Sequence, residues 1–138
     1  MPEQKTCQQR VAGKLESRIS DLENLWKAYK EDPDKEVEDL GTFDEYGLAF
    51  DYVKPGTFND QKRGYFRYQL SYGGPSDEFR FYCDENLDPA KIEYWFLDWF
   101  DGASIDLTGE NYNLMEEIFL DFKETSTVQH KLDASQEE

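Results

Sequence analysis

The sequence predicts a single α+β domain in which a three-stranded antiparallel meander packs on aromatic-rich helices, in the order α-β-β-β-α-α. Two observations support this fold class. The spacing of apolar residues follows a helical period near the N-terminus, changes to a period of two in the middle of the chain, and then returns to a helical period. Aromatic residues make up 16% of the 138 residues, which supplies enough large apolar surface for one core over residues 1–124.

The first element, within residues 1–31, is predicted to be an amphipathic helix. Its apolar residues recur every three or four positions and form a narrow seam of Val11, Leu15, Ile19, Leu22, Trp26 and Tyr29. Pro33 ends the helix because proline disfavours the α conformation of the residue before it. The seam can pack across the sheet of the same chain or form a homodimer with a second copy, and its short length favours packing within the chain.

The sheet is predicted within residues 46–83, where apolar and polar side chains alternate. Three segments carry this alternation: residues 46–53, 65–72 and 78–83. The connection GGPSD (73–77) suits a tight turn, so the second and third segments should form an antiparallel hairpin. The connection at 54–64 is longer than hairpin loops usually are and is therefore a candidate functional loop.

Two helices are predicted within residues 88–124. Asp88 followed by Pro89 is typical of a helix start. Residues at i, i+3, i+4, i+7, i+8 and i+11 form an apolar stripe expected to face the core: Ile92, Trp95, Phe96, Trp99, Phe100 and Ala103. The second helix is expected from about Gly109 to Glu124. Residues 125–138 lack a buried pattern and are expected to form a disordered tail.

The chain is strongly acidic, with 31 Asp and Glu against 15 Lys and Arg and a formal net charge of −16. The acidic excess is concentrated in residues 31–60 and 91–138. Such a charge repels nucleic acid and anionic membranes and attracts basic protein surfaces. No apolar run reaches the ~18 residues of a membrane-spanning helix, and the widely separated Cys7 and Cys83 suggest reduced thiols. We therefore expect a cytoplasmic protein that contacts no membrane.

No residue pattern points to an enzyme, a metal site or a cofactor. His130, the single histidine, lies in the expected tail, which would not hold a catalytic base in place. Asp32, Asp34 and Glu36 alternate as at the start of a calcium loop, but the glycine and the closing glutamate of such a loop are missing. We therefore expect a non-enzymatic protein with no catalytic residue, no metal and no cofactor.

The first functional hypothesis is that this is an acidic interaction protein that mimics DNA. Carboxylates spaced along one surface would occupy the basic groove of a DNA-binding protein, with the counterion release that DNA itself exploits. The partner would then be the basic surface of a protein, and direct contact with nucleic acid is not expected. The candidate residues for this surface are Asp32, Asp34, Glu36, Glu38, Asp39, Asp98, Asp101, Glu117 and Asp121.

The alternative hypothesis is a nucleic-acid or small-ligand binding module that uses the outward face of the sheet. The residues of this face are Tyr65, Arg67, Arg80 and Tyr82. The run RGYFRYQLSY (63–72) partly follows an RNA-binding strand pattern, although Phe66 and Arg67 depart from it. The net charge opposes nucleic acid, and pairing of either arginine with Glu78 would explain the arginines without a ligand.

Two segments of the chain carry a resemblance to known proteins. The run FDYVKPGTFNDQKRGYFRYQLSYGGPSDEFRFY (50–82), followed by EYWFLDWFDGA (93–103), resembles small uncharacterised proteins of bacterial plasmids, conjugative elements and phages. Some of those proteins are associated with antirestriction functions. The resemblance implies a protein that serves a mobile element against a host-defence protein, and it implies no particular catalytic or binding residues.

Overall fold

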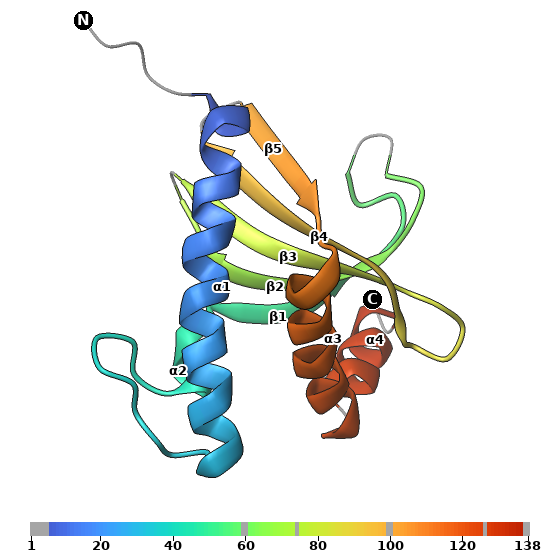
Figure 1. Cartoon of the computed structure of the whole chain (residues 1–138). Helices are drawn as coiled ribbons and strands as arrows, with labels where there is room; N and C mark the ends of the chain where they lie inside the picture. Colours follow the sequence, from blue (N-terminus) through green and yellow to red (C-terminus); the bar gives the residue numbers. More distant parts are fainter. Residues whose placement is uncertain (1–5, 59–60, 74, 99–100, 126, 137–138) are drawn as a thin grey trace, which may run out of the picture.

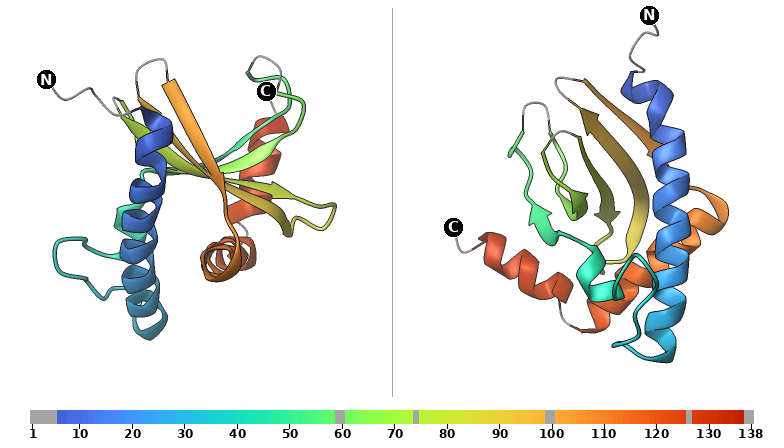
Figure 2. Two further views of the ribbon diagram at one scale, coloured as in Figure 1. Left: turned by 45° about the horizontal axis from the view of Figure 1, so that its top comes forward. Right: turned by 90° about the vertical axis from the view of Figure 1, so that its left-hand side faces the viewer.

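The computed structural model describes residues 6–58, 61–73, 75–98, 101–125 and 127–136 and has an α+β architecture (Figure 1). One antiparallel sheet of five strands carries α1 and α3 on one of its faces, as Figure 2 shows. The helices are α1 (Cys7–Glu31), α2 (Phe43–Tyr46), α3 (Gly109–Glu124) and α4 (Thr127–Gln136). The strands are β1 (Ala49–Val53), β2 (Tyr65–Ser71), β3 (Ser76–Cys83), β4 (Pro89–Asp98) and β5 (Asp101–Asp106).

The sheet is a meander in which each strand pairs with the next one along the chain, in the order β1-β2-β3-β4-β5. The first three strands lie where the period-two alternation predicts them, and β2 and β3 form the expected hairpin. The prediction of a three-stranded sheet is nevertheless wrong, because β4 and β5 extend it.

The segment predicted as an aromatic helix is the β4–β5 hairpin. Ile92, Tyr94 and Phe96 alternate along β4 and are 1%, 0% and 2% exposed on the helix-covered face. Trp95 lies between them on the opposite face, since adjacent residues of a strand point to opposite sides. The apolar residues match the i, i+3, i+4 spacing of a helix only because both faces of this strand are rich in aromatic residues. Such residues favour strands, and the tertiary pairing with β3 satisfies the backbone of β4.

The apparent helix start at Asp88 and Pro89 is a turn followed by the first residue of β4. Proline is tolerated at the beginning of a strand because its missing N–H need not join the ladder there. The carboxylate of Asp84 closes the turn by accepting hydrogen bonds from the backbone N–H groups of Asn86 (2.8 Å) and Asp88 (3.1 Å). Trp99 and Phe100, which the helix prediction also included, lie outside the described residues.

The N-terminal helix forms as predicted and begins with a capping box. The Thr6 hydroxyl accepts from the Gln9 N–H, and the Gln9 side chain accepts from the Thr6 N–H. The seam from Val11 to Trp26 is buried, and α1 packs on β4 and β5 of the same chain. The apolar seam is therefore occupied within the chain, and a homodimer through α1 would have to use its charged face.

The core lies between the sheet and the helices and is largely aromatic. Phe119 of α3 contacts three strands, with ring centroids 6.2 Å from Phe50, 5.6 Å from Phe66 and 4.9 Å from Phe81. Clusters of tilted rings of this kind add about 0.5–1.5 kcal/mol per pair to the burial of their surface. The helix predicted at 109–124 is thus confirmed and holds β1, β2 and β3 together.

Residues 127–136, expected to be disordered, form α4, which lies beside β1. Val128 is 0% exposed, and Leu132 packs against the same core. Two apolar side chains four residues apart are enough to dock a short helix on an existing surface, although they leave too weak a period to be recognised in the sequence.

A buried polar network joins α1 to the sheet. Asp77 of β3 is 3% exposed and points toward the helices, where it accepts two hydrogen bonds from the Arg18 guanidinium at 2.7 and 3.0 Å. The hydroxyls of Tyr94 and Ser71 also donate to this carboxylate. The remaining terminal nitrogen of Arg18 donates to the Tyr46 hydroxyl at 2.7 Å. Every charged group of this pair is therefore bonded, as a buried ion pair requires.

We expect Arg18→Met to lower the free energy of unfolding by roughly 3–5 kcal/mol, because it leaves the Asp77 carboxylate buried without its counter-ion. The double variant Arg18→Met with Asp77→Leu should be less destabilised than the sum of the two single variants. Urea unfolding of the four proteins measures this coupling. Lys35→Met, which removes the exposed ion pair to Glu31, is the control and should change the value by under about 1 kcal/mol. If the effects of Arg18→Met and Asp77→Leu on the free energy of unfolding were strictly additive, the two residues would not be coupled and the network would be contradicted.

We also expect the protein to lose stability in alkaline solution. Burial raises the pKa of Tyr46 and of Cys83 to about 12, and it raises the pKa of Tyr68 and Tyr94 above the ordinary tyrosine value. These groups ionise at about pH 8.5–10 in an unfolded chain. At a pH above about 8.5–10, these groups are therefore ionised in the unfolded chain but still protonated in the folded one, and unfolding releases protons. The free energy of unfolding is therefore highest below this pH and decreases as the pH rises toward 12.

Urea midpoints measured near pH 8 and near pH 10.5 test this dependence. The midpoint should be lower at the higher pH and should recover when the sample is returned to neutral pH. Equal midpoints would show that the tyrosine hydroxyls and the thiol are not buried as described.

Candidate ligand site on the outer face of the sheet

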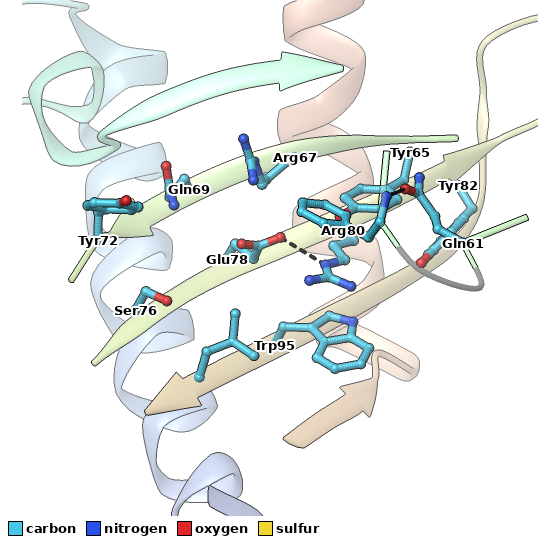
Figure 3. Close-up of a pocket in the computed structure, with 12 residues that line it drawn as sticks. Gln61, Tyr65, Arg67, Gln69, Tyr72, Ser76, Glu78, Arg80, Tyr82 and Trp95 are labelled. Atoms are coloured by element: carbon cyan, nitrogen blue, oxygen red, sulfur yellow. Dashed lines mark hydrogen bonds and ion pairs between the residues drawn. The ribbon is translucent and has the colours of Figure 1, made fainter. Parts of the chain in front are cut away.

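The face of the sheet that α1 and α3 do not cover carries the residues of the alternative sequence hypothesis. Tyr65 and Arg67 of β2 and Arg80 and Tyr82 of β3 all line one cavity of about 580 Å³ on this face (Figure 3). The alternation of β2 and β3 predicts this grouping, and the structure brings the four side chains together, with Tyr65 buried rather than exposed. The volume is within the range of small-molecule sites, which is about 300–1,000 Å³.

We call this cavity the outer groove and define it by the residues at its centre and ends. The centre is formed by Tyr65, Arg67, Glu78, Arg80, Tyr82 and Trp95. Its lining is completed by Phe58 and Gln61 of the 54–64 loop and by Gln69, Tyr72, Ser76 and Leu97. The candidate functional loop therefore contributes to the groove.

The strand register places four charged residues in one row across the outer face. Asp51 is opposite Arg67, Arg67 is opposite Arg80, and Arg80 is opposite Glu93. Like charges directly opposite each other destabilise a sheet, so the central pair of arginines requires compensation. Carboxylates on neighbouring strands and along β3 provide it.

Arg67 is neutralised by Asp51 in a bidentate ion pair. Its Nε and one terminal nitrogen donate to the two carboxylate oxygens at 3.0 and 2.7 Å. Such parallel bonds are among the stronger charge-assisted contacts. The pKa of Arg67 is raised chiefly by this hydrogen bonding, so the guanidinium stays charged.

Arg80 is held between two aromatic rings at the centre of the groove. Its guanidinium carbon lies 4.8 Å from the centroid of the Tyr65 ring and 4.1 Å from that of Trp95. Its Nε donates to Glu78 at 2.8 Å, and the Glu78 side chain is only 4% exposed. Figure 3 shows the guanidinium between the Glu78 carboxylate and the Trp95 ring. The pairing of Arg80 with Glu78 confirms the ligand-independent role considered from the sequence.

Trp95 is fixed in turn by the strand that carries it. Its indole N–H donates to the carboxylate of Glu93, two residues earlier on β4, at 3.0 Å. Sequence analysis missed Trp95 as a site residue because it was assigned to the core stripe of a helix. The alternation Glu93, Trp95, Leu97 is the signal that would have placed it on the outer face.

Two tyrosines of the groove are protonated over a wide pH range. Tyr65 is 2% exposed, and its hydroxyl is buried with no hydrogen-bond partner in the part of the chain that the structure describes. Burial raises its pKa. The pKa of Tyr82 is raised to about 12 by burial and by the nearby Glu93 carboxylate. Both hydroxyls are therefore hydrogen-bond donors at neutral pH rather than anions.

The 54–64 loop is organised by Gln61. Its side-chain amide donates to the carbonyls of Lys54 (3.2 Å) and Arg63 (2.9 Å) and accepts from the Phe58 N–H (3.0 Å). At the return to β2, a Cβ on Gly64 would overlap the Tyr52 hydroxyl, so a larger residue there would force the Tyr52 ring to move. The loop therefore presents Phe58, which is 51% exposed, at the rim of the groove.

The acidic residues of the DNA-mimic hypothesis lie at two ends of α1. The exposed residues Asp32, Asp34, Glu36, Glu38 and Asp39 follow its C-terminal end. Glu117 and Asp121 of α3 are at the same end, next to Lys30 and Tyr29 of α1. These seven carboxylates are therefore brought to one end of the molecule.

Asp98 and Asp101 lie at the opposite end of α1 and have bonded roles there. Asp98 pairs with Arg10 at 2.6 Å, and Asp101 accepts from the Cys7 N–H at 2.8 Å. A helix of 25 residues is roughly 37 Å long, so these two carboxylates are far from the other seven. The structure does not join all nine candidates in one patch.

The metal-ligating side chains of the described residues do not form a cluster. This part of the chain contains no group of three or more His, Cys, Asp or Glu side chains arranged to hold a metal ion. His130 is on the exposed side of α4. None of the helices described here has the length and apolar character needed to cross a membrane.

Comparisons with known proteins give no further identification. The chain matches no protein-family model, no curated protein and no solved structure. A function must therefore be argued from the outer groove and from the distribution of charge.

Proposed function

We propose that this chain is a non-enzymatic binding protein whose outer groove holds a small ligand. The observation that carries the proposal is the cavity of about 580 Å³ in which aromatic rings surround guanidinium nitrogens that have no partner among the described residues. Ligand sites typically combine such apolar walls with a few fixed polar groups.

The rigidity of the groove supports ligand binding. Arg67, Arg80 and Trp95 are each oriented by a carboxylate on the sheet rather than by solvent. Their geometry is therefore set before a ligand arrives, which lowers the entropy cost of binding. The aromatic residues Phe58 and Tyr72 are 51% and 81% exposed at the rim, where a ligand would cover them.

The net charge of −16 favours a small ligand over a nucleic acid in this groove. A nucleic acid has a backbone charge on every nucleotide, and the acidic surface would repel it along its whole length. A neutral or singly charged small molecule meets only the local charges, which are balanced in pairs within the groove.

We expect ligands found in a small-molecule screen to bind in the outer groove and to lose affinity in the variant Tyr72→Ala. The loss should be about threefold to tenfold, because the variant removes one aromatic contact. Thermal-shift screening followed by backbone amide chemical-shift mapping measures both the binding and its place. Tyr72 is exposed, so its replacement should not affect folding.

Leu48→Ala is the matched control, since Leu48 is 58% exposed and does not line the groove. Ligands should bind this variant as they bind the wild type. Chemical-shift changes confined to other surfaces, or equal effects of the two variants, would overturn the proposed site.

The clustering of seven carboxylates beside the C-terminal end of α1 favours a second candidate, an acidic surface that mimics DNA toward a basic protein. The exposed carboxylates of the connection from Asp32 to Asp39 have no cationic partner among the described residues. Their charges are thus available to a partner at low salt.

For this second candidate we expect a DNA-binding protein to be retained from a bacterial lysate at low salt and to be displaced by duplex DNA. The triple variant Asp34→Asn, Glu36→Gln, Glu38→Gln should release the DNA-binding protein at a lower salt concentration than the wild type does. The control variant Glu16→Gln, Glu23→Gln, Glu85→Gln changes the net charge equally at other exposed positions. Retention that DNA does not displace, or equal weakening by both variants, would exclude mimicry by this surface.

A further inference from the structure

Arg80 has donors that the protein itself does not use. Only its Nε is bonded, to Glu78, and neither terminal nitrogen has a partner among the described residues. In Arg67, Nε and one terminal nitrogen bond to Asp51, which leaves the other terminal nitrogen unbonded in the same part of the structure. The two arginines are directly opposite each other on β2 and β3. Three terminal guanidinium nitrogens are thus available at the centre of the outer groove.

The aromatic rings restrict how a ligand reaches these donors. Tyr65 and Trp95, from the strands on either side of β3, flank the Arg80 guanidinium with ring centroids 4.8 and 4.1 Å from its carbon, so they limit the directions of approach. A ligand must therefore approach the edge of the guanidinium, where the N–H groups point. The partner that suits this edge is a planar group with two acceptor oxygens, which is the geometry of a carboxylate.

The charges around the arginines are balanced in pairs and oppose a ligand that carries several negative charges. Asp51 and Glu78 pair with the two arginines, and Glu93, beside Trp95, is the next carboxylate in the row. The site has no surplus of positive charge, so an anion gains from the directed donors rather than from a general positive field. A polyanion would meet these carboxylates and the net charge of −16.

The remainder of the groove suits a flat apolar group. Leu97 and Trp95 line it on β4, and the exposed rings of Tyr72 and Phe58 stand at its rim. Aromatic rings favour offset or edge contacts with another ring. Resting on the proposed function, we infer that the ligand is a planar aromatic monocarboxylic acid, with its carboxylate on Arg80 and Arg67 and its ring against Trp95.

The test compares 2-naphthoate with its neutral analogue 2-naphthamide on the intact chain. Isothermal titration gives the affinities, and backbone amide chemical shifts give the place of binding. We expect the carboxylate to bind about tenfold to a hundredfold more tightly than the amide, because its bonds to the guanidinium groups are charge-assisted at both ends. This comparison requires no variant and so does not depend on the folding of one.

Variants then assign the preference to Arg80. Arg80→Lys keeps the positive charge beside Glu78 but loses the planar edge, and it should remove most of the preference for the carboxylate. Arg63→Lys is the matched control, since it makes the same replacement at an arginine that lies over Tyr82 at 5.3 Å but does not line the groove. It should leave the preference unchanged.

The outcomes separate this inference from the proposed function. If both compounds bind in the groove with equal affinity, or if Arg80→Lys keeps the preference, the carboxylate assignment is overturned while the groove remains a ligand site. If neither compound binds there, the aromatic acid is excluded, and the small-molecule screen with its Tyr72→Ala comparison decides separately whether the groove binds ligands.

Discussion

The ion pair between Arg18 and Asp77 is the constraint on which the arrangement of this domain depends. Asp77 is on β3, the central strand, and it points to the side of the sheet that α1 covers. A buried carboxylate at this position is tolerable only if α1 supplies its counter-ion. The pair therefore specifies which face of the sheet the long helix covers, and Tyr94 and Ser71 add donors from the neighbouring strands.

The two faces of the sheet use the same kind of ion pair in different ways. On the inner face, all three nitrogens of Arg18 are bonded, and Asp77 receives donors from three other residues. On the outer face, only one nitrogen of Arg80 donates a hydrogen bond, to Glu78, and two aromatic rings orient the guanidinium. A saturated network can only hold the structure together, whereas an ordered but unsaturated one can also recognise a ligand.

The carboxylates of the chain fall into two groups according to their position relative to α1. Some carboxylates, such as Asp77, Asp98 and Asp101, bond to groups of α1 and belong to the fold. Others, from Asp32 to Asp39, extend into solvent beyond its C-terminal end. A net charge of −16 therefore does not describe one continuous surface, and its effect on any partner depends on which end of α1 the partner meets.

The sequence by itself determined the α+β class, the long N-terminal helix, the first three strands, the helix at 109–124 and the grouping of Tyr65, Arg67, Arg80 and Tyr82 on one face. Each of these depends on local periodicity, which is set by backbone geometry. Tertiary structure decided β4 and β5, because a segment with aromatic residues on both faces satisfies a helical and a strand period, and pairing with β3 selects the strand. It also decided the docking of α4 and the partners of Asp77 and Arg80, since contacts between distant residues leave no periodic signal in the chain.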